Sequence, residues 1–381
     1  MKICMLIEAW KPIWGGGQAH VWELANALVK NHECKVDIFV MDIKGSDEKK
    51  YQEYFNGKLR IFRVGNKTRF NFIDRINWCY KIKKLIQLEH KKETYNLIHA
   101  HANLPGWPAK KIGKKLNLPI VYTVHGCGVK SIKDMYKNPI ISTVLYWFEN
   151  YLQTKIKYDY EITVDKSFLE YKNKNKQLSI IPNGASVEKF DKIKSSKSKN
   201  FKIIFVGRLH PQKGLSYLIK ATNLIRKELG NSEIHLVGGG PEEKELKELT
   251  SKLKLHNIIK FRGKIYGDDL VKEYKSANLF VLPSLYEGQP LTLLEAWGAK
   301  LPVIVTNVGG NEDFIEEGKN GYMIDAKNIK TLSETLIKAK KNKNLAKMGL
   351  EGYKLVKEKY SWNQTAKKTF KIYNKVLKNE K

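Results

Sequence analysis

Short, continuous runs of apolar residues recur along the chain, and most of them are followed by a stretch with helical periodicity. The first run, Lys2–Ile7, leads through a glycine-containing loop into a helical pattern over Gln18–Lys30. Continuous apolar runs of this length are typical of parallel strands that are buried on both faces. The alternation therefore predicts a parallel sheet with helices on both sides. Further strands of the first half are predicted at Lys35–Met41, Asn96–Ala100, Ile120–Val124 and Glu161–Val164.

The pattern is interrupted near Gln177–Lys202, where a Pro-Asn-Gly turn is followed by a stretch rich in Lys and Ser that has no periodicity. Such a stretch is typical of an interdomain linker. The alternation then resumes, and 381 residues are enough for two domains. We therefore predict two doubly wound α/β domains, over residues 1–190 and 200–360. Strands of the second are predicted at Phe201–Val206, Glu233–Val237, Ile258–Phe261, Leu279–Leu282 and Pro302–Val305.

The end of the chain has the pattern of one amphipathic helix, Ser361–Lys378, which opens with Trp362 and carries many lysines. This helix has no strand of its own to cover. We predict that it packs back across the junction between the domains, so that residues 361–381 complete the first domain.

The chain is strongly basic, with 69 Lys and Arg against 39 Asp and Glu and a formal net charge of +30. The excess is spread over both halves, and Lys outnumbers Arg by 62 to 7. Base recognition relies on Arg side chains that bind guanine and on charge concentrated on one element. The distribution therefore disfavours a specific nucleic-acid partner, and it leaves attraction to phosphate ligands or to an anionic membrane surface.

The cysteines Cys4, Cys34, Cys79 and Cys127 show no C-x-x-C spacing, so neither a disulfide framework nor a zinc ribbon is predicted. This usage fits a reducing, cytoplasmic compartment. The apolar run at the N-terminus is too short for a signal peptide. The longest uninterrupted apolar candidate, Pro139–Phe148, is about half of the ~20 residues that cross a bilayer. We expect a soluble protein, or one attached peripherally to the inner face of the cell membrane.

The segment Pro283–Lys300 follows the predicted strand that ends at Leu282 and carries the most informative pattern. Pro290 is well placed to open a helix, because its missing N–H would have no partner at that position. The free N–H groups of Gln289 and Leu291, together with the helix dipole, would then form an anion site at the carboxyl end of a strand. This arrangement predicts a phosphate ligand.

Two glutamates in this segment are candidates for substrate binding. Glu287 lies in the loop before the predicted helix, and Glu295 lies within the helix among Leu, Ala and Trp residues. A carboxylate in apolar surroundings is costly unless something forms hydrogen bonds with it. Ribose hydroxyls would serve. A backbone donor or a Lys in a purely structural role is the alternative.

A second candidate segment, Phe201–Leu215, joins a strand to a basic loop. The strand leads into Gly207 and Arg208, and Lys213 follows five residues later. Two cations in one loop repel each other unless an anion lies between them, and a diphosphate supplies both the charge and the acceptor oxygens. A solvated basic loop is the alternative in a chain so rich in Lys.

Glycine-rich turns follow two further predicted strands, at Gly15–Gly17 and Gly238–Gly240. The α/β folds bind ligands at such positions. Neither turn has the G-x-G-x-x-G spacing, so a nicotinamide or flavin enzyme is disfavoured.

Histidines also lie at predicted strand ends. His125 precedes a glycine and is placed to reach a ligand, with a structural hydrogen-bonding role as the alternative. His99 and His101 form an H-x-H pair without a third ligand at a suitable spacing, so no metal site is predicted.

In their order and spacing, these blocks resemble the retaining glycosyltransferases of the GT-B fold, specifically family 4, also called glycosyl transferases group 1. The resemblance spans nearly the whole chain. The blocks are the Gly15–Gly17 loop, YTVHG around His125, the Pro182-Asn183-Gly184 turn, GRLHPQKG, LVGGGPE, the E-x7-E segment from Glu287 to Glu295, and Tyr360-Ser361-Trp362 before the last helix. The resemblance implies two Rossmann-like domains facing across a cleft, with the C-terminal helix crossing back to the first.

The resemblance also implies a role for each matching residue. Arg208 and Lys213 would hold the donor diphosphate, Glu295 the ribose and Glu287 hydroxyls of the transferred sugar. His125 would contact that sugar from the opposite domain. The remaining donor-site residues would be Gly16, Gly17, Gly207, Gly239, Gly288, Gln289, Pro290 and Leu291.

The implied reaction moves a sugar from a nucleoside-diphosphate-sugar to a hydroxyl of a glycan or lipid-linked acceptor, in cell-surface polysaccharide or glycolipid synthesis. Fixed cations and helix N–H groups would bind the leaving diphosphate, so no metal or cofactor is expected. Members of the family retain the anomeric configuration, and the acceptor hydroxyl attacks on the face of the leaving group. For that reason we assign no general base.

The acceptor side is less well matched. Asp165 stands where many relatives have Ser, and Gln18-Ala19 where an acid is frequent. Residues 75–92 and 106–115 mix Trp and apolar residues with Lys, which suits contact with a membrane surface; ordinary amphipathic helices are the alternative.

Two other functions stay open at this point. A nucleotide-sugar epimerase can share two Rossmann-like domains, but it would need acid and base carboxylates around the sugar. A nonenzymatic basic binding protein would release no nucleoside diphosphate.

Overall fold

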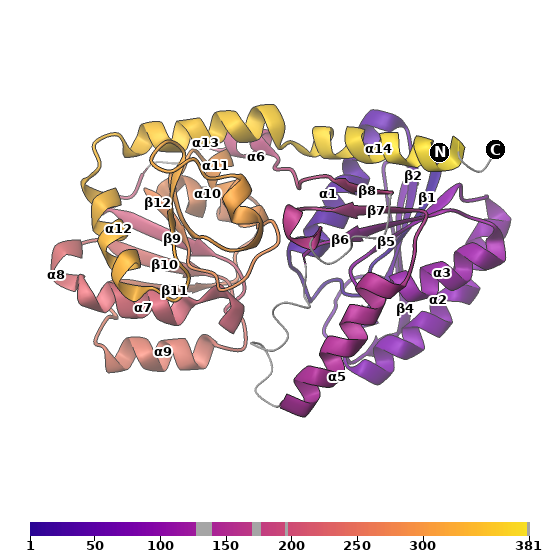
Figure 1. Ribbon diagram of the computed structural model, residues 1–381, viewed down its shortest axis with the longest axis horizontal. Helices are drawn as coiled ribbons and strands as arrows, with labels where there is room; N and C mark the ends of the chain where they lie inside the picture. Colours follow the sequence, from indigo (N-terminus) through magenta and orange to yellow (C-terminus); the bar gives the residue numbers. More distant parts are fainter. Residues whose placement is uncertain (127–138, 170–176, 195–196, 379–381) are drawn as a thin grey trace. The chain divides into compact units, whose positions relative to one another are not determined.

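The computed structural model of the chain describes residues 1–126, 139–169, 177–194 and 197–378 (Figure 1). The chain forms two compact units, which we call the N-unit (Met1–Asn183 with Trp362–Lys381) and the C-unit (Gly184–Ser361). The division therefore falls before the helix α6 (Val187–Lys192), whereas the sequence analysis placed the end of the first domain at residue 190. Val187 and Phe190 of α6 are buried in the core of the C-unit. For that reason α6 belongs to the C-unit, and the boundary falls before it.

The N-unit is built on an eight-stranded sheet with the order β3-β4-β2-β1-β5-β6-β7-β8. All neighbours pair in parallel except β3, which is antiparallel to β4. The strands are β1 (Lys2–Leu6), β2 (Lys35–Ile43), β3 (Tyr51–Tyr54), β4 (Leu59–Thr68), β5 (Leu97–His101), β6 (Ile120–Val124), β7 (Tyr160–Thr163) and β8 (Leu178–Ile180).

The order of the strands reverses at β1, which pairs with β2 on one side and β5 on the other. In open parallel sheets, the crevice beyond the carboxyl ends of the strands at such a reversal is the usual place for a ligand. The Gly15–Gly17 loop follows β1, His101 ends β5 and His125 follows β6. The topology thus brings three features of the sequence analysis to one edge of this sheet.

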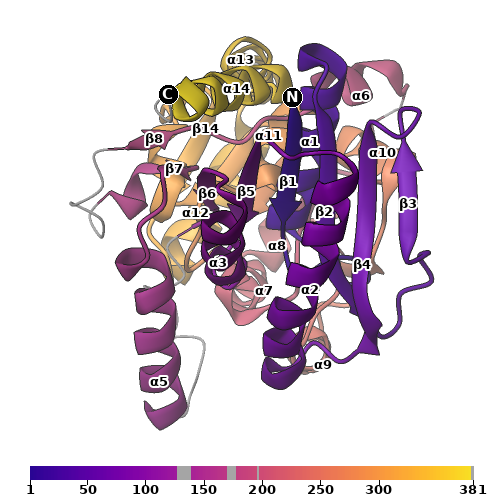
Figure 2. The same ribbon diagram turned by 90° about the vertical axis from the view of Figure 1, so that its right-hand side faces the viewer.

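Helices cover both faces of the N-unit sheet, with α1 and α14 on one face and α2 and α3 on the other (Figures 1 and 2). Apolar residues of α14 recur at helical spacing, from Trp362 to Val376, and are buried. This confirms the predicted return of the last helix to the first domain. None of the helices within the described ranges is long and apolar enough to cross a membrane. The helices are α1 (Gly16–His32), α2 (Phe72–Lys92), α3 (Gly106–Leu116), α5 (Pro139–Asn150) and α14 (Trp362–Lys378).

The C-unit contains a six-stranded, fully parallel sheet with the order β11-β10-β9-β12-β13-β14. Its order reverses between β9 and β12. The strands are β9 (Lys202–Val206), β10 (Glu233–Val237), β11 (Ile259–Gly263), β12 (Leu279–Leu282), β13 (Val303–Thr306) and β14 (Gly321–Ile324). The helices besides α6 are α7 (Leu215–Leu224), α8 (Arg226–Leu229), α9 (Glu243–Lys252), α10 (Gly267–Ser276), α11 (Leu291–Gly298), α12 (Ile329–Lys341) and α13 (Leu345–Lys359).

The ten strands expected from continuous apolar runs are all present, which confirms the two parallel α/β domains. Four strands were not predicted: β3, β4, β8 and β14. β3 is an exposed, polar edge strand and β8 has only three residues, so neither carries a buried apolar run. Cys4, Cys34 and Cys79 are buried free thiols, and Cys127 lies outside the described residues.

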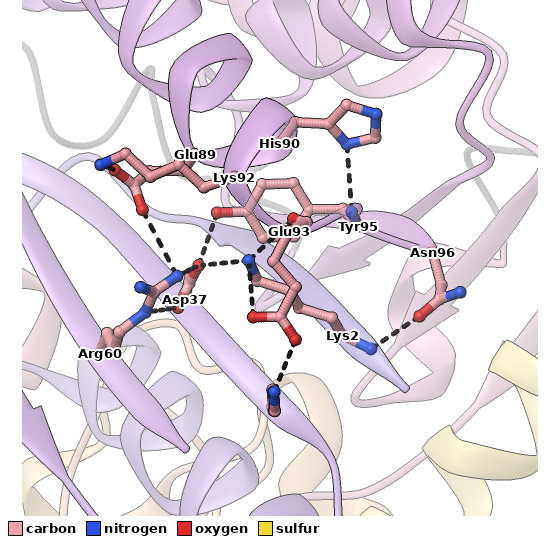
Figure 3. Close-up of polar contacts among 10 residues, drawn as sticks. Lys2, Asp37, Arg60, Glu89, His90, Lys92, Glu93, Tyr95 and Asn96 are labelled. Atoms are coloured by element: carbon pink, nitrogen blue, oxygen red, sulfur yellow. Dashed lines mark hydrogen bonds and ion pairs between the residues drawn. The ribbon is translucent and has the colours of Figure 1, made fainter. Parts of the chain in front are cut away.

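A network of charged side chains lies where β1, β2 and β4 begin, at the edge of the N-unit sheet opposite the carboxyl ends (Figure 3). Asp37 is 1% exposed and accepts two hydrogen bonds from Arg60, at 2.7 and 2.5 Å. The hydroxyl of Tyr95 donates to Asp37 at 2.6 Å, and Nζ of Lys2 lies 3.7 Å from it. The hydrogen bond to Asp37 raises the pKa of Arg60. This network joins three strands at their amino ends.

We expect Asp37→Ala to lower the free energy of unfolding by about 3–5 kcal/mol, because it removes the buried carboxylate that Arg60, Lys2 and Tyr95 share. Arg60 then keeps only the longer contact to Glu89, and Lys2 keeps its contacts to Glu93. Urea denaturation followed by tryptophan fluorescence would measure the loss. Asp47→Ala, at an exposed aspartate, is the matched control and should stay within about 0.5 kcal/mol of the parent. Equal effects of the two substitutions would show that the network contributes nothing.

Candidate active site

The carboxylate of Glu287 is the centre of the candidate site in the C-unit. Glu287 lies in the loop after β12 and is only 4% exposed. Nζ of Lys213, from the loop after β9, lies 2.5 Å from its Oε1, and the hydroxyl of Ser284 donates to the same oxygen at 2.5 Å. A buried carboxylate is costly unless it is paired and hydrogen-bonded. Lys213 and Ser284 meet this requirement and leave Oε2 without a partner among the described residues.

Hydrogen bonds join the loop after β9 to the loop after β12. The N–H of Leu285 donates to the carbonyl of Gln212 at 2.7 Å, and the side-chain amide of Gln212 donates to the carbonyl of Tyr286 at 2.9 Å. Gly214 adopts a left-handed conformation (φ +62°), and a Cβ there would lie 2.1 Å from the carbonyl oxygen of Pro283. A glycine directly after Lys213 therefore allows the two loops to meet.

A third loop, after β13, supports the backbone around Glu287. Gly309 has a φ of +55°, and a Cβ there would lie 1.8 Å from the carbonyl oxygen of Glu287. The N–H of Gly310 donates to the carbonyl of Gly288 at 2.8 Å. The main chain at Glu287 and Gly288 is thus held from both sides.

The other predicted cation, Arg208, lies on the same loop as Lys213 and is exposed. Between them, His210 has its pKa lowered by burial and then by the positive charges of Arg208 and Lys213. The positive charges of Arg208 and Lys213 are therefore both close enough to His210 to influence it. Nδ1 of His210 accepts the N–H of Gln212 at 3.3 Å, which caps the short 3-10 turn that carries Lys213.

Glu295 lies in α11, as predicted, and is half-buried. The hydroxyl of Tyr274, from α10, donates to its Oε2 at 2.9 Å. Tyr274 is fully buried, and burial together with the charge of Glu295 raises its pKa well above the usual value. One hydrogen-bond partner of Glu295 is thus a tyrosine, which no pattern in the sequence indicates.

The residues that the sequence analysis expects to bind a phosphate lie at the start of α11. The helix begins at Leu291, and Pro290 occupies the capping position before it, one residue earlier than the first helical position that the sequence analysis gave it. Gln289 is buried. Gly207 and Gly239 lie at the same edge of the sheet, where the N–H of Gly207 donates to Val237 at 3.0 Å and the carbonyl of Gly239 accepts from Leu209 at 3.1 Å. This edge therefore carries all the C-unit residues that were predicted for the donor.

The predicted residues of the N-unit also lie close to one another. Gly15 caps α1, and Gly16 is its first residue, with nothing within 4 Å of the point where a Cβ would lie. A Cβ at Gly17 would lie 3.6 Å from the ring of His125. The glycine loop is therefore open at Gly16 and packs against the imidazole at Gly17.

His125 belongs to a group of four histidines that the sequence analysis did not assemble. Nδ1 of His101 lies 3.3 Å from Nε2 of His125, and the rings of His99 and His101 are 3.9 Å apart between centroids. His20, from α1, lies edge-on to His125 at 4.6 Å. Burial and the neighbouring imidazoles lower the pKa values of His99, His101 and His125 well below 6.5; burial lowers that of His20 to about 4. The group is therefore neutral at pH 7.

Comparison with known proteins identifies the chain. Residues 14–189 match the model of Glycosyltransferase Family 4, and residues 186–354 match that of Glycosyl transferases group 1. An uncharacterized glycosyltransferase of Methanocaldococcus jannaschii is 31% identical over 98% of both chains. The chain belongs to glycosyltransferase family 4, also called glycosyl transferases group 1. A second relative is the UDP-Gal:alpha-D-GlcNAc-diphosphoundecaprenol alpha-1,3-galactosyltransferase of Escherichia coli, which is 28% identical over 77% of this chain and 78% of its own.

Solved structures confirm the GT-B fold for this family 4 glycosyltransferase. Sucrose-phosphate synthase from Thermosynechococcus elongatus superposes with a TM-score of 0.86 over 99% of both chains at 21% identity. WaaG, a glycosyltransferase involved in lipopolysaccharide biosynthesis, gives a TM-score of 0.76 over 97% of this chain and 99% of its own at 18% identity. The two parallel α/β units are those of the GT-B glycosyltransferases.

The sequence analysis of this glycosyltransferase missed the residues that position the predicted ones. Ser284 and Gly309–Gly310 follow strands at the same edge as Glu287, and their places after β12 and β13 are the only signal for them. His20 lies three residues after the glycine loop, within a helix, where nothing marks it as a neighbour of His125.

We expect Gly214→Ala to destabilise the glycosyltransferase by more than about 1–2 kcal/mol, because a Cβ would both strain the left-handed conformation and collide with the carbonyl of Pro283. Gly267→Ala is the matched control, since Gly267 has a φ of +60° and open space at its Cβ position. Urea denaturation gives the free energy of unfolding of both variants. The loss in the Gly267 variant reports the backbone strain alone, and the difference between the two losses reports the collision. Equal losses would show that the close approach of the two loops costs nothing.

Proposed function

We propose that the enzyme transfers a sugar from a nucleoside-diphosphate-sugar to an acceptor hydroxyl, with retention of the anomeric configuration and without a metal ion. The observation that carries the proposal is the contact between Lys213 and Glu287 at the carboxyl edge of the C-unit sheet. Relatives support the donor class: the E. coli relative is named for UDP-Gal, and HepE of Anabaena was solved with UDP and with UDP-glucose.

The cationic loop supplies the chemistry of the leaving group. Cleavage of the bond between sugar and phosphate places negative charge on the nucleoside diphosphate and leaves an oxocarbenium-like sugar. Arg208, Lys213 and the first turn of α11 would bind this charge, and fixed donors lower the barrier because they need no reorganisation during the reaction. Because these groups bind the charge on the diphosphate, the proposed transfer has no step that requires a metal ion.

Glu287 would have two tasks. In the free enzyme it fixes the position of Nζ of Lys213 through the 2.5 Å contact at Oε1. Its Oε2 is available to accept a hydrogen bond from a hydroxyl of the transferred sugar. A carboxylate held between a cation and the sugar therefore links binding of the sugar to placement of the charge that activates its phosphate.

Glu295 would bind the ribose. The hydroxyl of Tyr274 donates a hydrogen bond to one carboxylate oxygen and so orients the side chain in its apolar helix. The donor-site residues Gly16, Gly17, Gly207, Gly239, Gly288, Gln289, Pro290 and Leu291 would surround the donor, as the family resemblance implies.

His125 would contact the transferred sugar. Its lowered pKa keeps the ring neutral at pH 7, so it can accept or donate a hydrogen bond to a sugar hydroxyl without adding charge. In a retaining transfer, the departing phosphate takes the proton of the attacking hydroxyl, and His125 needs no role as a base.

For the acceptor we propose a glycan or lipid-linked sugar, used at a membrane surface that the enzyme binds peripherally. Exposed apolar side chains gather on one face of α5, where Val144 and Trp147 are 62% and 68% exposed, and Tyr151 continues that face. The ring of Phe148 contacts Phe72 at the start of α2 at 5.9 Å. α2 carries six Lys or Arg and two Asp or Glu, and α3 carries four Lys. Exposed aromatic residues beside lysines favour an anionic bilayer.

A screen of nucleoside-diphosphate-sugars for thermal stabilisation tests the donor class first. One donor should raise the melting temperature well above the others, because binding to the folded state alone stabilises it. Incubation of that donor with a range of hydroxyl acceptors, followed by NMR of the product, would then report the anomeric configuration. If no donor stabilises the chain, or the product is inverted, the proposal fails. An epimer formed from donor alone would favour the epimerase.

We expect Lys213→Ala to lower kcat/KM by about 10²- to 10³-fold, because it removes a fixed positive charge from the leaving diphosphate. Lys227→Ala, at an exposed lysine of α8, is the matched control and should leave the rate unchanged. Steady-state assays that follow release of nucleoside diphosphate would measure both. Near-normal turnover of the Lys213 variant would contradict the assignment.

We expect Trp147→Glu to weaken binding to vesicles of anionic phospholipid by about tenfold or more, since a buried aromatic side chain contributes on the order of 2 kcal/mol. Co-sedimentation at low and high salt measures it. Tyr266→Glu is the control, because Tyr266 lies on the C-unit with a comparable exposure of 61%. Equal binding by the two variants, or no binding by the parent, would favour a soluble acceptor.

A further inference from the structure

The four clustered histidines of the N-unit are not equivalent. Nδ1 of His99 lies 2.6 Å from the hydroxyl of Tyr373 in α14, and its Nε2 lies 2.7 Å from the hydroxyl of Thr123. Both ring nitrogens of His99 are therefore engaged. The ring of His101 lies beside that of His99 at an interplanar angle of 38°, and His99 has no free lone pair for a ligand.

The other three imidazoles converge. One ring nitrogen from each of His20, His101 and His125 lies within 4.8 Å of the other two. The closest pair, Nδ1 of His101 and Nε2 of His125, is 3.3 Å apart. Nitrogens bound to one tetrahedral zinc ion at 2.0–2.1 Å are about 3.3 Å apart. This pair already has the required separation, and the nitrogen of His20 lies within 4.8 Å of both.

The surroundings suit ligands to a metal ion. Nδ1 of His20 lies 2.6 Å from Oδ1 of Asn183, an acceptor, so Nδ1 carries the proton and Nε2 keeps its lone pair. Such a partner on the far nitrogen is the usual support of a metal-binding histidine. Nε2 of His101, the ring nitrogen that does not contact His125, is buried and has no hydrogen-bond partner among the described residues, so the protein does not otherwise satisfy this ring.

We propose that His20, His101 and His125 bind one divalent transition-metal ion of the zinc type, with the fourth position open to water or an anion. Three imidazoles without a carboxylate select Zn²⁺, Co²⁺, Ni²⁺ or Cu²⁺ over Mg²⁺ and Ca²⁺. The site is separate from the leaving-group chemistry, which needs no metal ion. On the proposed function, a metal ion at His125 would compete with the transferred sugar, so the ion is an inhibitor and a chelator leaves turnover intact.

Titration of the full chain with Co²⁺, without any sugar or nucleotide, tests the site independently of the transferase activity. Absorption in the visible range should show the bands of a tetrahedral ion with nitrogen ligands and without thiolate charge transfer, and they should saturate at one equivalent. Zn²⁺ should displace Co²⁺. No visible bands, or saturation well above one equivalent, would overturn the proposal.

His20→Ala and His101→Ala should each weaken the binding of Co²⁺ by at least about tenfold. His90→Ala, at a half-buried histidine of α2 outside the cluster, should bind as the parent does. If burial makes His101→Ala unfold, as circular dichroism would reveal, the half-buried His125→Ala replaces it. Retained binding in folded His20 and His125 variants would overturn the assignment of the ligands. Inhibition of transfer by Zn²⁺ is a separate measurement, and its absence would contradict only the link to the sugar.

Discussion

The contact between Lys213 and Glu287 depends on the cost of burying a carboxylate. Glu287 is almost fully removed from water, so it must have a cation and a hydrogen-bond donor, and Lys213 and Ser284 supply them. To bring these side chains together, the loops after β9 and β12 must touch. One backbone and one side-chain hydrogen bond between Gln212 and the second loop fix that contact. The charge that is proposed to activate the donor is thus placed by the same contacts that hold the loops.

The amino and carboxyl ends of the parallel strands carry different kinds of residues. At the amino ends of the N-unit strands, Asp37 and Arg60 join neighbouring strands through a buried ion pair. In the C-unit, Lys202, the first residue of β9, pairs with Glu273 at 2.6 Å. At the carboxyl ends, the predicted glycines, His125 and the Lys213–Glu287 pair lie at or beyond the ends of the strands.

Much of the fold could be predicted because a parallel strand that is buried on both faces appears in the sequence as a continuous apolar run. β1 and β12 are examples. The edge strand β3 lacks that signal since water covers it, and β8 is too short to show it. The sequence could indicate Glu287, Lys213 and Glu295 because a charged side chain near a buried strand needs a partner or a ligand to compensate for its loss of water. Their partners could not: the hydroxyl of Tyr274 and the glycines at 309 and 310 come from other elements, and only the packing brings them near. The same holds for His20, which reaches His125 from a helix.

The most direct test of the account is a double-mutant cycle on Lys213→Ala and Glu287→Gln, measured as kcat/KM for the donor. If the two side chains act as one unit, the double variant loses no more than the more damaged single variant, within about twofold. Losses that simply add would show that Lys213 and Glu287 act independently, and would contradict the claim that the buried pair positions the activating charge.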